Sequence, residues 1–89
     1  MRLEWTKGED GIHTAAFDLD GVRGTVSMRA THDPGTMQWH MRGRITGLGK
    51  SAIVIRQAVP DTDPVESALD VFRRTCEYDV LVYAAEARS

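Results

Sequence analysis

The chain has 89 residues, of which 42% are hydrophobic and 27% charged, and its formal net charge is −2. This length gives one domain, residues 1–89, and the composition is that of an ordinary globular protein, which excludes the disordered, collagen-like and coiled-coil classes. A domain this small has little room for both a core and an enclosed substrate cavity, so the totals disfavour most enzymes.

The charges are segregated along the chain. Residues 22–56 hold six basic side chains and one acidic one, whereas the segments on either side are acidic. We therefore expect a two-faced molecule. The single cysteine, Cys76, cannot form an internal disulfide, and no stretch reaches the roughly 20 apolar residues of a membrane span. The first residues also lack the apolar part of an export signal, so we expect a cytoplasmic protein without membrane contact.

The first two thirds of the chain are typical of antiparallel strands, because apolar and polar residues alternate between turn residues. Leu3 and Trp5 predict a short first strand, and residues 12–19 predict a second. Asp20-Gly21 is typical of a type I′ hairpin turn. With these two residues as the loop, the register places three pairs opposite one another: Leu19 and Val22, Phe17 and Gly24, and Ala15 and Val26.

The third and fourth strands, residues 22–30 and 37–45, each have one apolar face and one polar face. A four-residue loop that pairs Thr31 with Thr36 keeps both alternations in register. Met37, Trp39, Met41, Gly43 and Ile45 then face the core. On the wet face this register places Arg23 opposite Arg44, Thr25 opposite Arg42, Ser27 opposite His40, and Arg29 opposite Gln38. On the apolar face it places Met28 beside Trp39 and Gly24 beside Gly43, and we expect an aromatic side chain of the helix or of the second strand to fill the space that these glycines leave.

Residues 51–59 predict a fifth strand that ends at Pro60. A helix is then indicated, with Asp63 as its N-cap, Pro64 at its first position and Glu66 completing a capping box. Apolar residues recur at helical spacing at Val65, Ala68, Leu69, Phe72 and Cys76.

The sequence of residues 79–85 is compatible with either a strand or a helix. The four residues 80–83 have strong β preference, which favours a last strand. The predicted fold is therefore α+β: a curved antiparallel sheet of five or six strands packed against one helix in the C-terminal half of the chain.

Two short motifs resemble known catalytic ones. Residues 17–22, Phe-Asp-Leu-Asp-Gly-Val, resemble the first motif of the haloacid dehalogenase superfamily. The resemblance implies Asp18 as nucleophile and Asp20 as acid/base around magnesium, but it covers six residues and lacks the further motifs and the doubly wound α/β domain of those enzymes. Gly47-Leu48-Gly49-Lys50-Ser51 resembles the end of a phosphate-binding P-loop, without its first glycine. We favour plain hairpin loops at both places.

Metal and cofactor sites are not predicted. His13, His32, His40 and Cys76 have no recognised ligand spacing, and Cys76 lies on the apolar face of the predicted helix.

The wet face of the predicted sheet is the strongest functional signal. We predict a partner-binding surface made of Arg23, Arg29, His40, Arg42, Arg44 and Arg56. Like charges opposite each other on a sheet are unfavourable, so they need an internal acid, solvent or an anionic partner. The alternative interpretation is a solubilising face that Asp18, Glu4 or the acidic C-terminal segment neutralises.

The nature of the partner follows from the aromatic residues. A nucleic-acid surface usually interleaves basic residues with exposed aromatic ones, whereas the aromatic residues here fall on predicted core faces. An acidic protein surface therefore fits better, with weak nucleic-acid binding through the same face as the alternative. A small phosphate-handling enzyme that uses Asp18 and Asp20 is a further alternative, and a homodimer through an uncovered edge strand stays open.

The order of strand tryptophan, hairpins, Gly-Lys-Ser turn and capped Asp-Pro-Val-Glu-Ser-Ala-Leu helix is similar to that of small phage- or prophage-encoded α+β proteins. The resemblance implies a noncatalytic binder, such as an inhibitor of a host enzyme or defence complex, that needs no cofactor. It carries no diagnostic motif and names no target.

Overall fold

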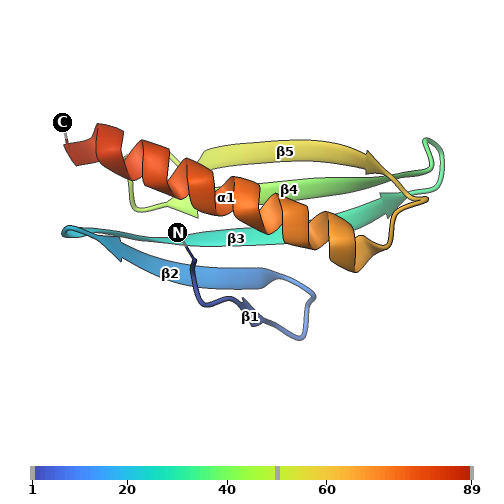
Figure 1. Ribbon diagram of the computed structural model, residues 1–89, viewed down its shortest axis with the longest axis horizontal. Coiled ribbons are helices and arrows are strands. Elements are labelled where there is room, and N and C mark those ends of the chain that lie inside the picture. The colour runs from blue at the N-terminus through green and yellow to red at the C-terminus, as the bar shows by residue number, and fades with distance from the viewer. Residues whose placement is uncertain (1, 50, 89) are drawn as a thin grey trace.

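The structure is a computed structural model that describes residues 2–49 and 51–88. It contains one antiparallel sheet in the strand order β1-β2-β3-β4-β5 and one helix, α1, that lies across one face of the sheet (Figure 1). The elements are β1 (Thr6–Lys7), β2 (His13–Leu19), β3 (Val22–Asp33), β4 (Gln38–Thr46), β5 (Ile53–Pro60) and α1 (Val65–Arg88). The predicted α+β class is confirmed, with five strands.

The hairpin between β2 and β3 has the predicted register. Asp20 and Gly21 form the loop with φ angles of 55° and 87°, the left-handed values that a type I′ turn requires. Phe17 lies opposite Gly24, as expected. A Cβ atom at Gly24 would lie 2.0 Å from the Thr46 carbonyl oxygen and 2.6 Å from the Phe17 ring, so the glycine makes room for both.

The predicted register between β3 and β4 is wrong. Asp33, not Thr31, is the last paired residue of β3, and its partner is Gln38. The turn therefore lies two residues further along, where the Asp33 carboxylate accepts a hydrogen bond from the Gly35 N–H at 2.9 Å. Met37 belongs to this turn with a φ of 55° and is 65% exposed, so its predicted place in the core is also wrong.

The shift changes which residues face each other but not which face they occupy. Each β3 residue pairs four positions further along β4 than predicted, and an even shift preserves the alternation. Met28 lies opposite Gly43 instead of Trp39. The glycine-glycine pair is likewise not formed between Gly24 and Gly43.

The predicted last strand at residues 80–83 is wrong, because α1 continues to Arg88. Phe72, Cys76, Val80 and Ala84 follow one another at four-residue spacing and are all buried against the sheet. This helical periodicity outweighs the local β preference, which depends strongly on context.

The start of α1 lies within one residue of the prediction. The helix begins at Val65, and the carbonyl of Pro64 accepts a hydrogen bond from the Ala68 N–H at 3.1 Å. The carbonyl of Asp63 accepts a bond from Trp39 Nε1 at 3.2 Å. In residues 2–49 and 51–88, no side-chain hydrogen bond of the expected capping box is found.

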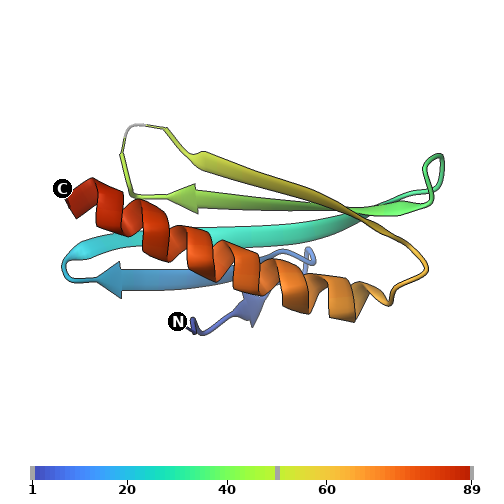
Figure 2. The same ribbon diagram turned by 45° about the horizontal axis from the view of Figure 1, so that its top comes forward.

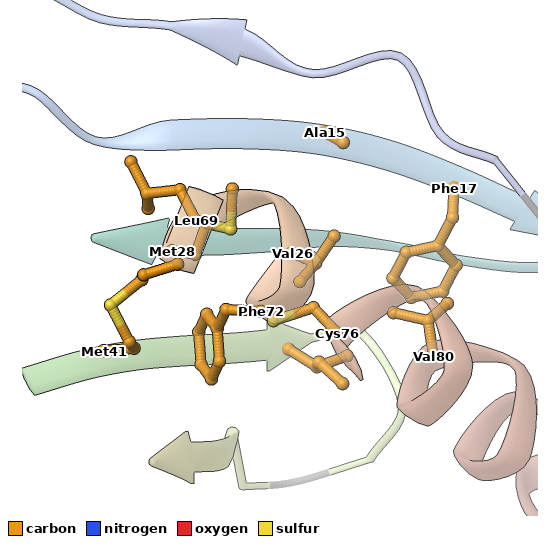
Figure 3. Close-up of a cluster of buried hydrophobic side chains, with 11 residues drawn as sticks. Ala15, Phe17, Val26, Met28, Met41, Leu69, Phe72, Cys76 and Val80 are labelled. Atoms are coloured by element: carbon orange, nitrogen blue, oxygen red, sulfur yellow. The ribbon is translucent and has the colours of Figure 1, made fainter. Parts of the chain in front are cut away.

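The core lies between α1 and strands β2, β3 and β4 (Figure 3). Phe72 and Cys76 come close to β4 at Gly43, where a Cβ atom would be 2.9 Å from the Cys76 sulfur and 3.3 Å from the Phe72 ring. The expected aromatic occupants are thus both present: Phe72 of the helix at Gly43, and Phe17 of β2 at Gly24.

The N-terminal segment packs on the helix instead of forming the predicted strand. The first strand is only Thr6–Lys7. The buried carboxylate of Glu77 accepts hydrogen bonds from the Leu3 N–H at 2.7 Å and from Trp5 Nε1 at 3.0 Å. Glu77 therefore fixes this segment to α1.

Candidate functional site

Three arginines lie side by side on the outer face of the sheet, the face that points away from α1. Arg29 of β3 is directly opposite Arg42 of β4, which is directly opposite Arg56 of β5. All three are exposed. We call these three residues the arginine row. Arg44 follows two positions along β4 and so lies on the same face.

The arginine row has no counterion among the residues that the structure describes. Among residues 2–49 and 51–88, no ion pair or side-chain hydrogen bond involves Arg29, Arg42, Arg44 or Arg56. Like charges directly opposite each other on a sheet are destabilising. The fold therefore holds these charges together without a compensating acid in the described part of the chain.

Two hollows open along the row. The larger has a volume of about 580 Å³ and is lined by all three arginines together with His40, Thr31 and Ala58, among others. A smaller hollow of about 200 Å³ lies beside Ser27 and Arg44. Both are lined by Arg29 and Arg42, so an anionic side chain seated in either one meets the centre of the row.

His40 lies at the margin of the row and is paired with an acid. Its Nε2 is 3.2 Å from the Asp33 carboxylate. A hydrogen bond from the Thr36 side chain, and then one from the Gly35 N–H, hold the pKa of Asp33 below its usual range. Asp33 therefore stays ionised near neutral pH and marks the acidic boundary of the basic face.

Arg23 does not belong to the row. Its predicted position opposite Arg44 is wrong, because the partner of Arg44 on β3 is Ser27. Arg23 instead lies opposite Asp18 of β2, and its Nε donates to that carboxylate at 3.0 Å. Arg23 and His40 are thus the two predicted site residues with an acidic partner among the described residues.

The predicted basic face did not include the arginine row itself. The predicted residues Arg29, Arg42, Arg44, Arg56 and His40 do share one face, but the expected partners of Arg29 and Arg42 were Gln38 and Thr25. The sequence does contain a signal for the correct register. Asp, Pro and Gly are favoured turn residues in this order, so Asp33-Pro34-Gly35 indicates a turn that begins at Asp33. A turn at that position brings Arg29 opposite Arg42.

The two motif-like segments are turns. Asp18 also accepts a bond from the Gly21 N–H at 3.2 Å, and Asp20 pairs with Arg88 at the end of α1. Both carboxylates are exposed on a hairpin of an antiparallel sheet. In the segment 47–51, Lys50 lies outside the described residues, and β5 follows it instead of a helix.

A second polar cluster joins β3 to the loop that follows β5. His32 Nε2 is 2.9 Å from the Asp61 carboxylate, and the His32 ring lies 4.9 Å from the Trp39 ring at an angle of 55°. With the Trp39–Asp63 hydrogen bond, these contacts attach the segment before α1 to the sheet.

Cys76 is a core residue. Burial, and then the nearby carboxylates of Asp79 and Glu77, raise the pKa of its thiol to about 12. The thiol is therefore protonated and unreactive in the folded protein. In the described ranges, no group of three or more His, Cys, Asp or Glu side chains could hold a metal ion.

No family model, curated protein or solved structure matches the chain. The resemblance to small phage or prophage proteins therefore stays a prediction. Within residues 2–49 and 51–88, no helix is both long enough and apolar enough to cross a membrane.

Proposed function

We propose that the chain is a noncatalytic binding module that docks an acidic protein surface onto the outer face of its sheet. The arginine row and Arg44 make the contact. One observation carries the proposal: three exposed arginines lie abreast on adjacent strands, with no acid among the described residues to pair them. Arg offers a planar fork of donors that matches a carboxylate in a bidentate pair.

Acidic protein is favoured over nucleic acid by the position of the aromatic side chains. Trp5, Phe17, Trp39 and Phe72 all pack against the core, on the side of the sheet that carries α1. The outer face therefore lacks the aromatic platforms on which single-stranded bases stack. Nucleic acid remains the second candidate because Arg binds phosphate as well as carboxylate.

The finer predictions belong to the same proposal. A phage-encoded inhibitor of a host enzyme or defence complex would act in the way proposed, by stoichiometric binding. The single buried thiol is consistent with the reducing cytoplasm as the compartment.

The test compares two anionic polymers and one charge reversal. We would measure binding of fluorescent poly-L-glutamate, and of duplex and single-stranded DNA, at low and physiological salt. Arg42→Glu places a carboxylate in the middle of the row. Arg74→Glu makes the same charge change on an exposed residue of α1 and serves as the matched control.

We expect poly-L-glutamate to bind the wild type and the Arg74→Glu control, and to bind Arg42→Glu at least about tenfold more weakly, because one close charge contact changes sign. Equal affinity of the wild type and Arg42→Glu would overturn the proposal. DNA binding that falls steeply with salt, without poly-L-glutamate binding, would replace acidic protein by nucleic acid as the partner.

A further inference from the structure

Strand β5 is an open edge of the sheet. It is the last strand in the order, and no strand or helix lies along its outer side in either view (Figures 1 and 2). The opposite edge strand, β1, has two residues, whereas β5 has eight. An unprotected edge of this length presents a row of backbone donors and acceptors to a partner strand.

The register shows which residues of β5 point outward. The Asp61 N–H donates to the Met37 carbonyl at 3.0 Å, in line with the pairing of Pro60 with Gln38. Because backbone groups alternate in direction along a strand, the odd-numbered residues of β5 bond to β4. The N–H and C=O groups of Val54, Arg56 and Ala58 therefore face the open edge.

Pro60 agrees with this assignment. It belongs to the even-numbered, outward set, so the N–H that proline lacks would have pointed away from β4. Proline is tolerated in strands at such edge positions.

Different chemistry flanks the edge on its two sides. On the outer side, Arg56 is the last residue of the arginine row. On the side of α1, Ile53, Ile55 and Val59 are only half-buried. A hollow of about 360 Å³ lies there between Ile53 and Tyr83. A strand placed along β5 would thus meet charge on one face and apolar surface on the other.

We propose that an extended acidic segment of the partner adds to β5 as a sixth, antiparallel strand, with acidic side chains on the arginine side and apolar ones on the α1 side. The proposal rests on the proposed function, because it names the form in which the acidic partner binds. A partner residue opposite Arg56 would exchange both backbone hydrogen bonds with it and place its carboxylate beside the guanidinium group.

A second copy of this chain fits the edge less well. The sequence of β5, Ile-Val-Ile-Arg-Gln-Ala-Val-Pro, contains no acidic residue. Pairing β5 with β5 of another copy would add a further arginine to the face without a counterion. Charge complementarity therefore favours a different, acidic chain.

The test uses a synthetic peptide of alternating valine and glutamate, as long as β5, and two N-methylated forms. In an antiparallel pair with glutamate opposite Arg56, the glutamate amides point to β5 and the valine amides point away. We expect methyl groups on two glutamate amides to weaken binding about tenfold or more, because two backbone hydrogen bonds are lost and the methyl groups obstruct the approach. Methyl groups on two valine amides are the matched control and should leave the affinity within about twofold.

A protein variant gives a second measurement. Ala58→Pro removes an outward N–H that makes no bond to β4, as proline already does at position 60. We expect circular dichroism of this variant to match the wild type, and peptide binding to be lost.

The outcomes separate the two proposals. Peptide binding that is insensitive to both methylation patterns and to Ala58→Pro would overturn strand addition, and loss of poly-L-glutamate binding in Arg42→Glu would still support the acidic docking face. If neither the peptide nor poly-L-glutamate binds, both proposals fall. Self-association of the protein without peptide in a sedimentation experiment, abolished by Ala58→Pro, would make a second copy the occupant and overturn the acidic strand.

Discussion

The two faces of the sheet are made by the same strands but differ in what holds them. On the α1 side, Val26, Met28 and Ile45 are fully buried beneath the helix, and apolar burial is the main favourable term in folding. On the other side, Arg29, Arg42 and Arg56 stand abreast in water and repel one another. The inner face therefore stabilises the fold, whereas the repulsion between the charges on the outer face opposes folding and destabilises it.

Removal of Phe72 tests the inner face and should have the largest effect. Phe72 is fully buried among the core side chains (Figure 3). It packs against Gly43, the residue that lets α1 approach β4. We expect Phe72→Ala to lower the free energy of unfolding by about 3–5 kcal/mol, because it leaves a cavity that the sheet cannot fill. Urea denaturation followed by circular dichroism measures this. A loss near that of an exposed residue such as Val71→Ala would contradict the described core.

Glu77 tests a polar contact on the same side. Glu77 is 6% exposed, and its carboxylate is the acceptor for both Leu3 and Trp5. We expect Glu77→Ala to cost about 2–4 kcal/mol, since two donors lose a charged acceptor. Glu77→Gln keeps an acceptor oxygen and should cost less. Tryptophan emission should shift to longer wavelength in Glu77→Ala, and an unchanged spectrum would show that the N-terminal segment is held by other contacts.

How far the sequence predicts this molecule depends on the loops. The Asp20-Gly21 loop has two residues, and only one register closes over it, so the β2–β3 pairs could be predicted. The β3–β4 loop has four residues, and pairing Thr31 with Thr36 or Asp33 with Gln38 preserves the alternation equally well. The face on which a side chain lies can be predicted from the alternation alone. Its neighbours on the adjacent strands can be predicted only when the position of the loop is known.

The same distinction explains the candidate site and the helix. Five of the six predicted site residues do lie near one another on the outer face, because the face is fixed by periodicity. The abreast position of Arg29 and Arg42 depends on register and could not be found without it. The extension of α1 through Val80 depends on contact with the sheet, which outweighs local β preference.

The pH dependence of stability provides a smaller test of the inner face. His13 is 9% exposed. Burial, and then the positive charges of Arg73 and Lys7, lower its pKa below the ordinary value of 6.5, while Glu66 opposes this weakly. As the pH falls below 6.5, the unfolded chain takes up a proton that the folded protein does not, so stability decreases until the pH passes the lowered pKa.

We expect His13→Gln to flatten this decrease, because glutamine does not titrate. The measurement is the free energy of unfolding in urea between about pH 7 and pH 5, where few carboxylates change charge. Equal slopes for the variant and the wild type would mean that His13 is protonated as easily in the folded protein as in the unfolded chain.

The smallest expected change in the free energy of unfolding is that of Arg42→Thr, and it distinguishes the two faces most clearly. Arg42 has a like-charged neighbour on each side, so Arg42→Thr should raise the free energy of unfolding by about 0.2–1 kcal/mol, even though it shortens an exposed side chain. Threonine also has a high β preference. The same variant should bind poly-L-glutamate more weakly than the wild type does.

Arg23→Thr is the matched control for this pair of changes. It makes the same substitution on the same face, but Arg23 is paired with Asp18, so no gain in stability is expected. A gain with Arg42→Thr and none with Arg23→Thr would show that the arginine row opposes folding. If Arg42→Thr instead lowers the free energy of unfolding and leaves poly-L-glutamate binding unchanged, the row would be a structural feature of the sheet. The outer face would then not be the surface that binds the partner.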